Sequence, residues 1–400
     1  MLAIRVPRVF DGERLIGGRT VLVDDGRIAG VEAHDAALPG DVPVRDFPGC
    51  TLLPGLIDAH VHLCADSGPR ALDRLAPGED DAPDDDALTG VIEGSLRAQL
   101  AAGVTAVRDL GDRRGAVPAW RNGAKHAADL PAVVASGPPV TSVRGHCWYL
   151  GGEARGEREM REAVRRLAES GADVVKVMAS GGVLTPGTDT MNPQLTDAEL
   201  AAVVAESRAL GLPVTAHAHA LTAVEQAIRA GVDGIEHCTC LTPDGVRISD
   251  ELLAALSGSG IFVCATLGHD PGVFVPPAVQ EMAARAGVTV EALEQGVRRL
   301  YEGGVRLVAG ADSGIGPAKP HGILPRTIAE YVQAGLPAAT ALAAATSVAA
   351  EACGLATRKG RIRPGHDADL LLVEGDPVED PSALRHLRAL FLAGRPHPLP

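Results

Sequence analysis

The chain has 400 residues, of which 46% are hydrophobic and 22% charged, an ordinary composition for a globular protein with a large core. Its formal net charge is −14 and only 2% of its residues are aromatic. These values argue against a nucleic-acid partner, because phosphates bind basic surfaces and bases stack on aromatic side chains. The seven cysteines form no C-x-x-C pair, and the first residues lack the apolar core of a signal peptide. We therefore expect reduced thiols and a cytoplasmic protein.

Strand patterns with turn signals fill the N-terminal region. They lie at residues 3–9, 19–23 and 27–33, with the hairpin signal Asp24-Asp25-Gly26 between the last two. From residue 51 onward apolar strands alternate with helical patterns, which indicates βα units and a parallel sheet. The apolar stretch at residues 337–356 is mostly alanine and threonine and contains Glu351. It predicts a packed helix and not a membrane span, so no membrane partner is expected.

Eight strands are expected in this alternating region, with helices between them. The strands are predicted at residues 53–62, 105–109, 132–136, 173–178, 213–217, 234–237, 261–265 and 306–311. The helices are predicted at residues 86–102, 158–170, 197–210, 221–230 and 250–257. Eight strand–helix units that close into a (β/α)8 TIM barrel are the simplest solution for this α/β pattern.

Strand patterns return after the last helices, at residues 359–373 and 387–392. The simplest arrangement pairs them with the N-terminal strands. We therefore predict two domains: a small β-sandwich built from residues 1–52 plus 359–400, and a TIM barrel built from residues 53–358.

Histidine, lysine and aspartate side chains lie in or directly after five of the predicted barrel strands. They are His60, His62, Lys176, His217, His237 and Asp312. His60 and His62 are two residues apart in a strand, so their side chains point to the same side. In a TIM barrel the carboxyl ends of the strands surround one pocket, where these residues would meet. Imidazoles and carboxylates suit Zn²⁺ and related divalent ions.

Lys176 is the unusual member of this set, because an ammonium group repels metal ions. It fits if burial lowers its pKa and the neutral amine reacts with CO₂, which gives a carbamate able to bridge two ions. Two metal ions about 4 Å apart would then share a hydroxide that is nucleophilic at neutral pH. The expected cofactors are two divalent ions, with zinc favoured, and a carboxylated Lys176.

Six segments together carry a family resemblance. They are Pro54-Gly-Leu-Ile-Asp-Ala-His-Val-His62, Val175-Lys-Val-Met-Ala-Ser-Gly-Gly182, Thr215-Ala-His-Ala-His-Ala220, Gly234-Ile-Glu-His-Cys238, Ala309-Gly-Ala-Asp-Ser-Gly314 and Gly365-His-Asp-Ala-Asp-Leu370. With this set the chain resembles, over almost its full length, the binuclear subtype of the amidohydrolase superfamily. Its likeness is greatest to the prolidase-like and imidazolonepropionase-like branch.

The resemblance implies a role for each member of the set. It implies that one metal ion is held by His60, His62 and Asp312, and the other by His217 and His237, with carboxylated Lys176 as the bridge. It also implies that Asp312 accepts the proton of the attacking water and passes it to the leaving amine, while a metal ion polarises the scissile carbonyl.

Substrate contacts are expected from two further places. Prolidase-like relatives often have tyrosine where this chain has His219, so His219 either donates to the oxygen that develops charge or makes a structural hydrogen bond. Relatives hold a substrate-contacting histidine at the position of His146. Beside it Arg144 would grip a substrate carboxylate and Tyr149 would wall the pocket; the alternative is a plain surface loop. The loop at residues 181–195 either covers the site or only connects.

The resemblance favours a hydrolase that cleaves an amide C–N bond of a small molecule, either an Xaa-Pro-type dipeptide or an N-acyl amino acid. Cyclic-amide hydrolysis, as in imidazolonepropionase, and mononuclear deamination are the alternatives. Deaminases typically carry glutamate where this chain has Ala220 and usually lack the lysine, which counts against deamination. An inactive scaffold is disfavoured because every ligand position is filled. The family resemblance alone suggests a homo-oligomer.

Overall fold

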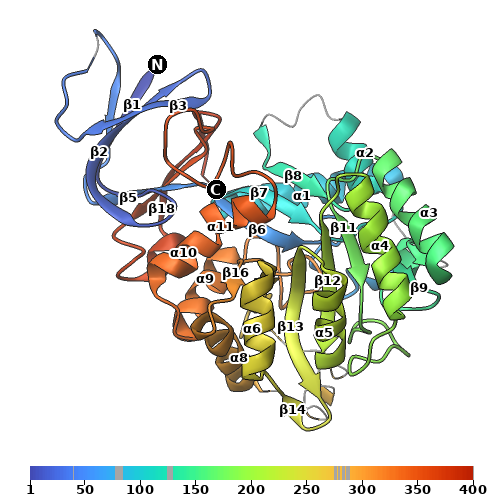
Figure 1. Cartoon of the computed structure of the whole chain (residues 1–400). Helices are drawn as coiled ribbons and strands as arrows, with labels where there is room; N and C mark the ends of the chain where they lie inside the picture. The colour runs from blue at the N-terminus through green and yellow to red at the C-terminus, as the bar shows by residue number, and fades with distance from the viewer. Residues whose placement is uncertain are drawn as a thin grey trace.

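The two ends of the chain meet in one mixed β-sheet (Figure 1). The computed structural model describes residues 1–38, 40–76, 84–123, 129–273, 277, 280–281, 284 and 289–399. The sheet has the order β19-β18-β17-β5-β1-β2-β3, with β4 paired to β1. Its strands are β1 (Leu2–Phe10), β2 (Leu15–Asp24), β3 (Arg27–Ala33), β4 (Val44–Asp46), β5 (Cys50–Pro54), β17 (Leu370–Glu374), β18 (Leu387–Leu392) and β19 (Arg395–His397).

This sheet differs from the predicted two-sheet sandwich. It curls until its β3 end meets the residues that precede β17, where the Ile28 amide donates to the His366 carbonyl (2.8 Å) and the Ala368 amide donates to the Gly26 carbonyl (2.9 Å). The curled sheet encloses a small apolar core of its own, which includes Ile4. Strand twist and coiling allow one sheet to cover both sides of such a core, so no second sheet is needed.

Most of the remaining β structure in the described part of the chain consists of eight parallel strands in two sheets. Three form one sheet in the order β6 (Leu56–Val61), β7 (Val104–Asp109) and β8 (Ala132–Ala135). Five form another in the order β11 (Val175–Met178), β12 (Val214–Ala220), β13 (Gly234–Thr242), β15 (Phe262–Cys264) and β16 (Arg306–Leu307). Parallel bridges join the two sheets, from Val140 to Val177 at one margin and from Val61 to Ser313 at the other. The carboxyl ends of the strands therefore gather at one rim.

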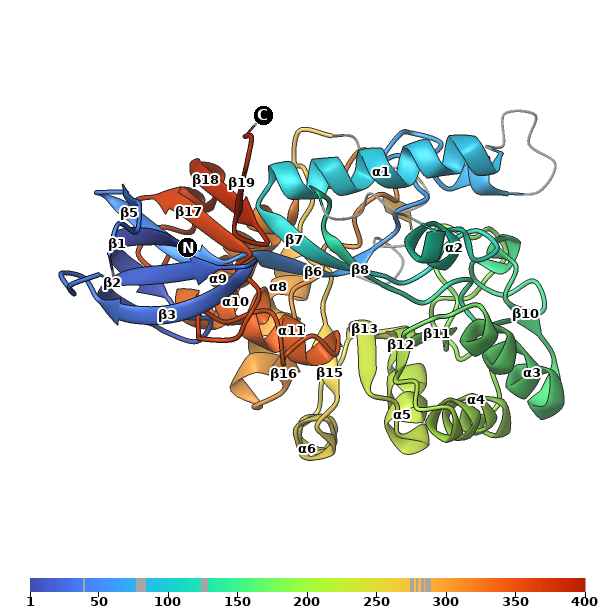
Figure 2. The ribbon, with the colours of Figure 1, turned by 90° about the horizontal axis from the view of Figure 1, so that it is seen from above.

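Helices flank these strands on the outside, as the views of Figures 1 and 2 show for α1 over β7 and for α3 to α5 beside β11 to β13. The helices are α1 (Asp85–Ala101), α2 (Ala116–Gly123), α3 (Gly156–Glu169), α4 (Asp197–Ala209), α5 (Leu221–Ala230), α6 (Asp250–Ser259), α8 (Val290–Glu302), α9 (Leu324–Gln333), α10 (Ala338–Ala344) and α11 (Ser347–Ala352). The shorter elements are β9 (Thr141–Ser142), β10 (Glu153–Ala154), β14 (Gly245–Val246) and the 3-10 turns η1 (Asp73–Leu75), η3 (Trp148–Leu150) and η4 (Pro381–Arg385).

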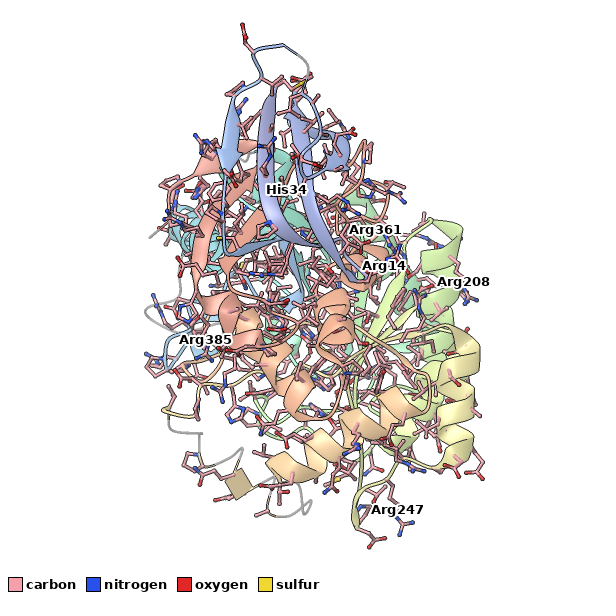
Figure 3. All side chains as sticks on the ribbon, turned by 90° about the vertical axis from the view of Figure 1, so that its left-hand side faces the viewer. Arg14, His34, Arg208, Arg247, Arg361 and Arg385 are labelled. Atoms are coloured by element: carbon pink, nitrogen blue, oxygen red, sulfur yellow. The ribbon has the colours of Figure 1, made fainter. Side chains whose placement is uncertain are left out.

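The predicted helix at residues 337–356 is two short helices, α10 and α11. In the part of the chain that the structure describes, no helix has both the length and the apolar character needed to cross a membrane. Long polar side chains lie around the outside, among them the labelled arginines of Figure 3 and His34, which is exposed.

One strand prediction was wrong in a way that matters for the site. Residues 53–62 were expected to form a single strand, but the chain changes sheet at Gly55. Pro54 pairs with Leu370 in the terminal sheet, whereas Leu56 pairs with Val104 in the parallel sheet. A Cβ atom on Gly55 would lie only 2.2 Å from the Thr105 hydroxyl oxygen, so the crossing point needs glycine.

Candidate metal centre

The first group of predicted site residues lies where β6 ends beside the segment after β16. His60 and His62 are almost fully buried, and both approach one carboxylate oxygen of Asp312: Nε2 of His60 at 3.4 Å and Nε2 of His62 at 3.1 Å. Asp312 is held there by its own backbone, because its amide donates to the His60 carbonyl (2.8 Å). Two imidazole nitrogens and a carboxylate oxygen thus converge within 4.8 Å of one another.

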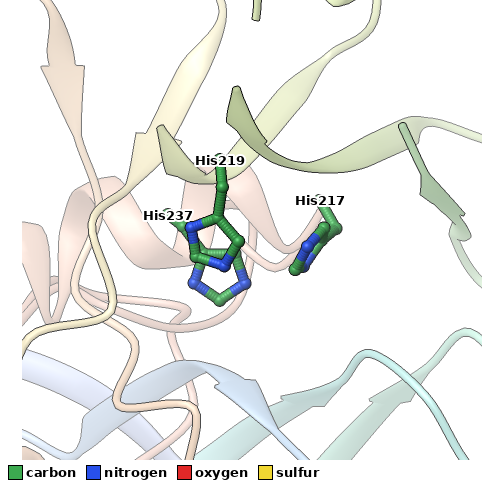
Figure 4. Close-up of side chains that lie close together, drawn as sticks. All are labelled: His217, His219 and His237. Carbon is green, nitrogen blue, oxygen red and sulfur yellow. The ribbon is translucent and has the colours of Figure 1, made fainter. Parts of the chain in front are cut away.

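The second group consists of three imidazoles from neighbouring strands (Figure 4). His217 and His219 lie on β12 and His237 on β13; their ring centroids are 4.6 Å apart for His217–His237, 4.7 Å for His217–His219 and 4.5 Å for His219–His237. The His60 and His237 rings, at 5.5 Å, connect this group to the first. We call His60, His62, His217, His219 and His237 the histidine cluster.

Lys176 of β11 is buried in the same place, with only 1% of its surface exposed. Burial lowers the pKa of its ammonium group, and the positive charge of Arg108 adds to this, while Glu236 and Asp312 act in the opposite direction. A buried amine with a lowered pKa is the form that can react with CO₂.

Most of the imidazoles are neutral. Burial lowers the pKa of His60 and His219 to about 4, in His60 with help from Lys176. Burial also lowers the pKa of His217 and His237 well below the usual value. His62 differs: burial opposes its charged form, but the hydrogen bond and charge of Asp312 raise its pKa. Neutral imidazole is the form that binds metal ions.

Hydrogen bonds to the far ring nitrogens orient these imidazoles. The Nδ1 atom contacts the Glu236 carboxylate in His60 (2.8 Å), the Gly111 carbonyl in His62 (3.0 Å), the Thr239 hydroxyl in His219 (2.8 Å) and the Thr266 hydroxyl in His237 (2.7 Å). His217 is the exception, since its Nε2 lies 3.1 Å from the Gly181 carbonyl. Such partners fix the tautomer and the ring orientation of a metal-binding histidine.

Two buried carboxylates near His60 were not predicted from the sequence. Glu236 accepts hydrogen bonds from Arg108 (2.9 Å) and the Thr215 hydroxyl (2.6 Å) in addition to its contact with His60. Asp58 accepts the His60 amide (3.2 Å), and burial raises its pKa to about 6. The only signal in the sequence was a charged residue in an apolar strand segment, at Asp58 in Leu-Ile-Asp-Ala and at Glu236 in Gly-Ile-Glu-His.

The residues predicted to contact substrate lie in different places. His146 joins the cluster: it is buried, its ring centroid lies 4.6 Å from that of His217, and its Nδ1 contacts the Thr185 hydroxyl (2.8 Å). Arg144 is exposed, and its guanidinium carbon lies over the Trp148 ring, 5.0 Å from the ring centroid. The Tyr149 hydroxyl is buried without a hydrogen-bond partner among the described residues.

The loop at residues 181–195 lies against the cluster and is therefore more than a distant connector. Its first residue, Gly181, offers the carbonyl near His217, and its Thr185 contacts His146. Gly182 packs so closely on His146 that a Cβ atom there would lie 2.3 Å from Nε2. Its arrangement sets the position of His146.

The donor set fits divalent metal ions. The groups that converge are neutral imidazole nitrogens and a carboxylate oxygen, which are ligands that Zn²⁺ prefers. They come from rigid strand ends, and hydrogen bonds already orient their rings. A positively charged lysine would oppose such ions, but burial favours its neutral form.

The amidohydrolase family model matches residues 51–396, which contain the whole histidine cluster together with Lys176 and Asp312. The chain belongs to the amidohydrolase family. Membership in this family implies the TIM barrel that the strand–helix alternation predicted.

Named relatives of this amidohydrolase have several substrates. Ochratoxinase of Aspergillus niger is 29% identical over 245 residues, which cover 58% of this chain and 48% of the fungal enzyme, so the match spans about half of that relative's length. Imidazolonepropionase of Mesorhizobium japonicum is 27% identical over 397 residues, covering 90% of this chain and 86% of the enzyme. The crystal structure of an Xaa-Pro dipeptidase with bound methionine in its active site is similar with a TM-score of 0.85 and 26% identity, covering 99% of both chains.

Proposed function

We propose that this amidohydrolase is a metal-dependent hydrolase that cleaves an amide C–N bond in a small molecule, of the Xaa-Pro dipeptide or N-acyl amino acid type. The observation that carries the proposal is the buried convergence of neutral imidazoles and the Asp312 carboxylate at the ends of parallel strands. Similarity to an Xaa-Pro dipeptidase over the full chain supports the substrate class.

In this proposal each ligand belongs to one of two divalent ions, with Zn²⁺ favoured. His60, His62 and Asp312 would hold one ion, His217 and His237 the other, and carboxylated Lys176 would lie between them. Carboxylation joins the neutral Lys176 amine to CO₂ and releases one proton, and the lowered pKa of Lys176 supports it. When bound, such ions polarise a carbonyl and lower the pKa of water to near neutral.

The remaining chemistry falls to the side chains of this chain. Asp312 would accept a proton from the attacking water and return it to the leaving amine; its carboxylate stays ionised because, although burial works against the charge, His60 and His62 hold its pKa well below the usual range. His219 and His146 would donate hydrogen bonds to the carbonyl oxygen as it gains charge. Their contacts with Thr239 and Thr185 support this by fixing the two rings.

We also propose that the chemistry belongs to a barrel domain of residues 53–358, and that residues 1–52 plus 359–400 form a separate β domain. The terminal strands pair with one another and enclose their own apolar core, which supports this division. The chain changes sheet at Gly55, two residues beyond the start of this barrel range, because Leu53 and Pro54 still pair with β17.

Hydrolysis of a cyclic amide is the second candidate. It is favoured by the 27% identity to imidazolonepropionase over 90% of this chain. The two candidates share the ring-orienting hydrogen bonds and the proton path through Asp312, so they differ in the substrate and not in the residues named above. A substrate screen separates them.

The test is the metal content of the purified protein together with a hydrolysis screen. We expect near two divalent ions per chain and turnover of Xaa-Pro or N-acyl amino acid substrates. Activity only on imidazolone-type rings would favour the second candidate. A protein that binds no divalent ion and hydrolyses none of these compounds would contradict the proposal.

Lys176→Ala tests the bridging role. It should abolish hydrolysis, because the bridging carboxylate is lost, and a short carboxylate such as propionate should restore part of the rate. The measurement is turnover with and without propionate. Lys359→Ala, which removes a lysine that pairs with Asp369 before β17, is the control and should need no propionate. Undiminished turnover of Lys176→Ala would rule out the bridge.

A further inference from the structure

Lys319 follows β16 and lies in no motif of the sequence, yet its ammonium group makes three hydrogen bonds inside the protein. Nζ donates to the carbonyl oxygens of Thr266 (2.7 Å), Ala311 (2.9 Å) and Gly268 (3.1 Å). These bonds use all three N–H donors of the group. The three carbonyls belong to two separate segments, one after β15 and one after β16, so Lys319 joins the two.

We propose that Lys319 is a positioning residue that fixes the position of His237, on one side of the metal centre, relative to Asp312 on the other. The inference rests on the proposed function, since it assigns a role toward the two ions of that centre. On each side of the cross-link, the peptide group that accepts from Lys319 belongs to, or adjoins, a residue that contacts the histidine cluster.

On the β15 side the link runs through Thr266 to His237. The Thr266 hydroxyl contacts Nδ1 of His237 at 2.7 Å, and the Thr266 carbonyl accepts from Lys319. Thr266 has a φ of 50°, a left-handed conformation that is strained for a β-branched residue. The hydrogen bond from the Lys319 ammonium group stabilises the Thr266 carbonyl in this direction.

On the β16 side the link runs through Ala311 to Asp312. The Ala311 carbonyl accepts from Lys319, and the next residue, Asp312, also has a left-handed φ of 57°. The Asp312 carboxylate lies near Nε2 of both His60 and His62. A shift of this peptide segment would move the carboxylate away from the two imidazoles.

The backbone of Lys319 is itself anchored to the same segment. Its amide donates to the Gly316 carbonyl (2.9 Å), and its carbonyl accepts the Gly314 amide (2.8 Å). The third acceptor, Gly268, is fixed on its other side because its amide donates to the Glu330 carboxylate (2.7 Å). Lys319 therefore joins two segments that are each held by further hydrogen bonds, the one after β16 and the one after β15. A mobile surface lysine would make no such set of contacts.

The experiment compares Lys319→Met, which keeps the chain length but removes every donor, with the wild-type protein. Lys359→Met is the matched control, because Lys359 is a mostly buried lysine that pairs with Asp367 and Asp369, just before β17 of the terminal sheet. The readouts are the Zn²⁺ dissociation constant by competition with a chelator, the absorption spectrum of bound Co²⁺, and amide hydrogen exchange of the metal-free protein.

For Lys319→Met we expect at least a tenfold rise in the Zn²⁺ dissociation constant, an altered Co²⁺ spectrum, and faster exchange in residues 264–268 and 310–314. Lys359→Met should lower thermal stability without these changes. Lys319→Gln, which retains two donors on a shorter side chain, should shift the same readouts and replaces the methionine variant if that one does not fold.

Wild-type Zn²⁺ affinity and a wild-type Co²⁺ spectrum in a folded Lys319 variant would overturn the inference. The proposed function fails separately, if the wild-type protein itself binds no Zn²⁺. In that case amide hydrogen exchange still tests the cross-link. Unchanged exchange in residues 264–268 and 310–314 of the Lys319 variant would show that Lys319 stabilises neither segment.

Discussion

Glu236 is a buried carboxylate that orients His60, one of the proposed metal ligands, without being a proposed ligand itself. It is 1% exposed and contacts Nδ1 of His60, while Arg108 and Thr215 donate to its other oxygen. We predict that Glu236→Gln weakens divalent-ion binding by about 10–100-fold, because the ring of His60 loses its charged partner. The same change leaves the buried Arg108 without a counter-charge, so it should also destabilise the fold. Chelator competition measures the first effect.

Glu206→Gln is the matched control for this prediction. Glu206 also pairs with arginine, through Arg165 at 2.7 Å, but it lies on α4 outside the parallel sheet. It should leave metal affinity unchanged. An unaltered dissociation constant in Glu236→Gln would mean that His60 keeps its orientation without the carboxylate.

At the same scale, the sequence could predict the residues that come together but not what holds them. His60, His217 and their partners were found because each has a side chain of a type that can serve metal binding and lies in a strand or directly after one. Lys319 was missed because nothing in the sequence says that a lysine in a loop folds back onto three carbonyls. For Arg144 the sequence left open a substrate contact and a plain surface loop, and the structure has its exposed guanidinium over the Trp148 ring. Loop conformation decides such cases, and local pattern does not encode it.

At the scale of elements, strand positions were predicted well and strand ends less well. The expected strand at residues 213–217 continues as β12 to Ala220, and the one at residues 234–237 continues as β13 to Thr242. Both extensions come from pairing beyond the apolar run: Ala220 pairs with Leu241, and Leu241 pairs with Val246 of β14. Hydrophobic periodicity cannot show pairing with a distant segment.

The loop at residues 181–195 supports a prediction at this scale. We expect Gly182→Ala to lower kcat at least tenfold, because the added methyl group would lie 2.3 Å from Nε2 of His146 and must displace that ring from its place beside His217. Metal affinity should change little, since His146 is not one of the proposed ligands. Steady-state kinetics with a metal titration separates the two quantities.

Gly90→Ala is a suitable comparison, because Gly90 lies in α1 with nothing within 4 Å of an added Cβ atom. That variant should keep full activity and gain slight helix stability. If Gly182→Ala were equally active, His146 would have no part in turnover or the loop would move freely away from it.

At the scale of the whole molecule, the meeting of the two chain ends was predictable, while the shape of their sheet was not. Strand patterns at both ends with no other partner indicated pairing, and β5 pairs with β17 over residues Cys50–Pro54. The sandwich was wrong because the register of β3 against residues 366–368 closes the sheet on itself. Register between segments more than three hundred residues apart leaves no periodic signal in the sequence.

The proposed ligands are spread from His60 to Asp312 and come from five different strands or their ends, so metal binding should couple to the stability of the whole fold. An ion that binds only the folded protein stabilises it by about 2.7 kcal/mol when its free concentration is one hundred times its dissociation constant. We therefore predict that a chelator lowers the unfolding temperature by several degrees and that Zn²⁺ restores it in a concentration-dependent way. The His62→Ala/His237→Ala variant, which removes one ligand from each proposed ion, should unfold at a temperature that no longer depends on Zn²⁺. If the wild-type protein also melts at the same temperature across Zn²⁺ concentrations that saturate it, the folded chain gains nothing from the ions, and the imidazoles are held together by their hydrogen bonds alone.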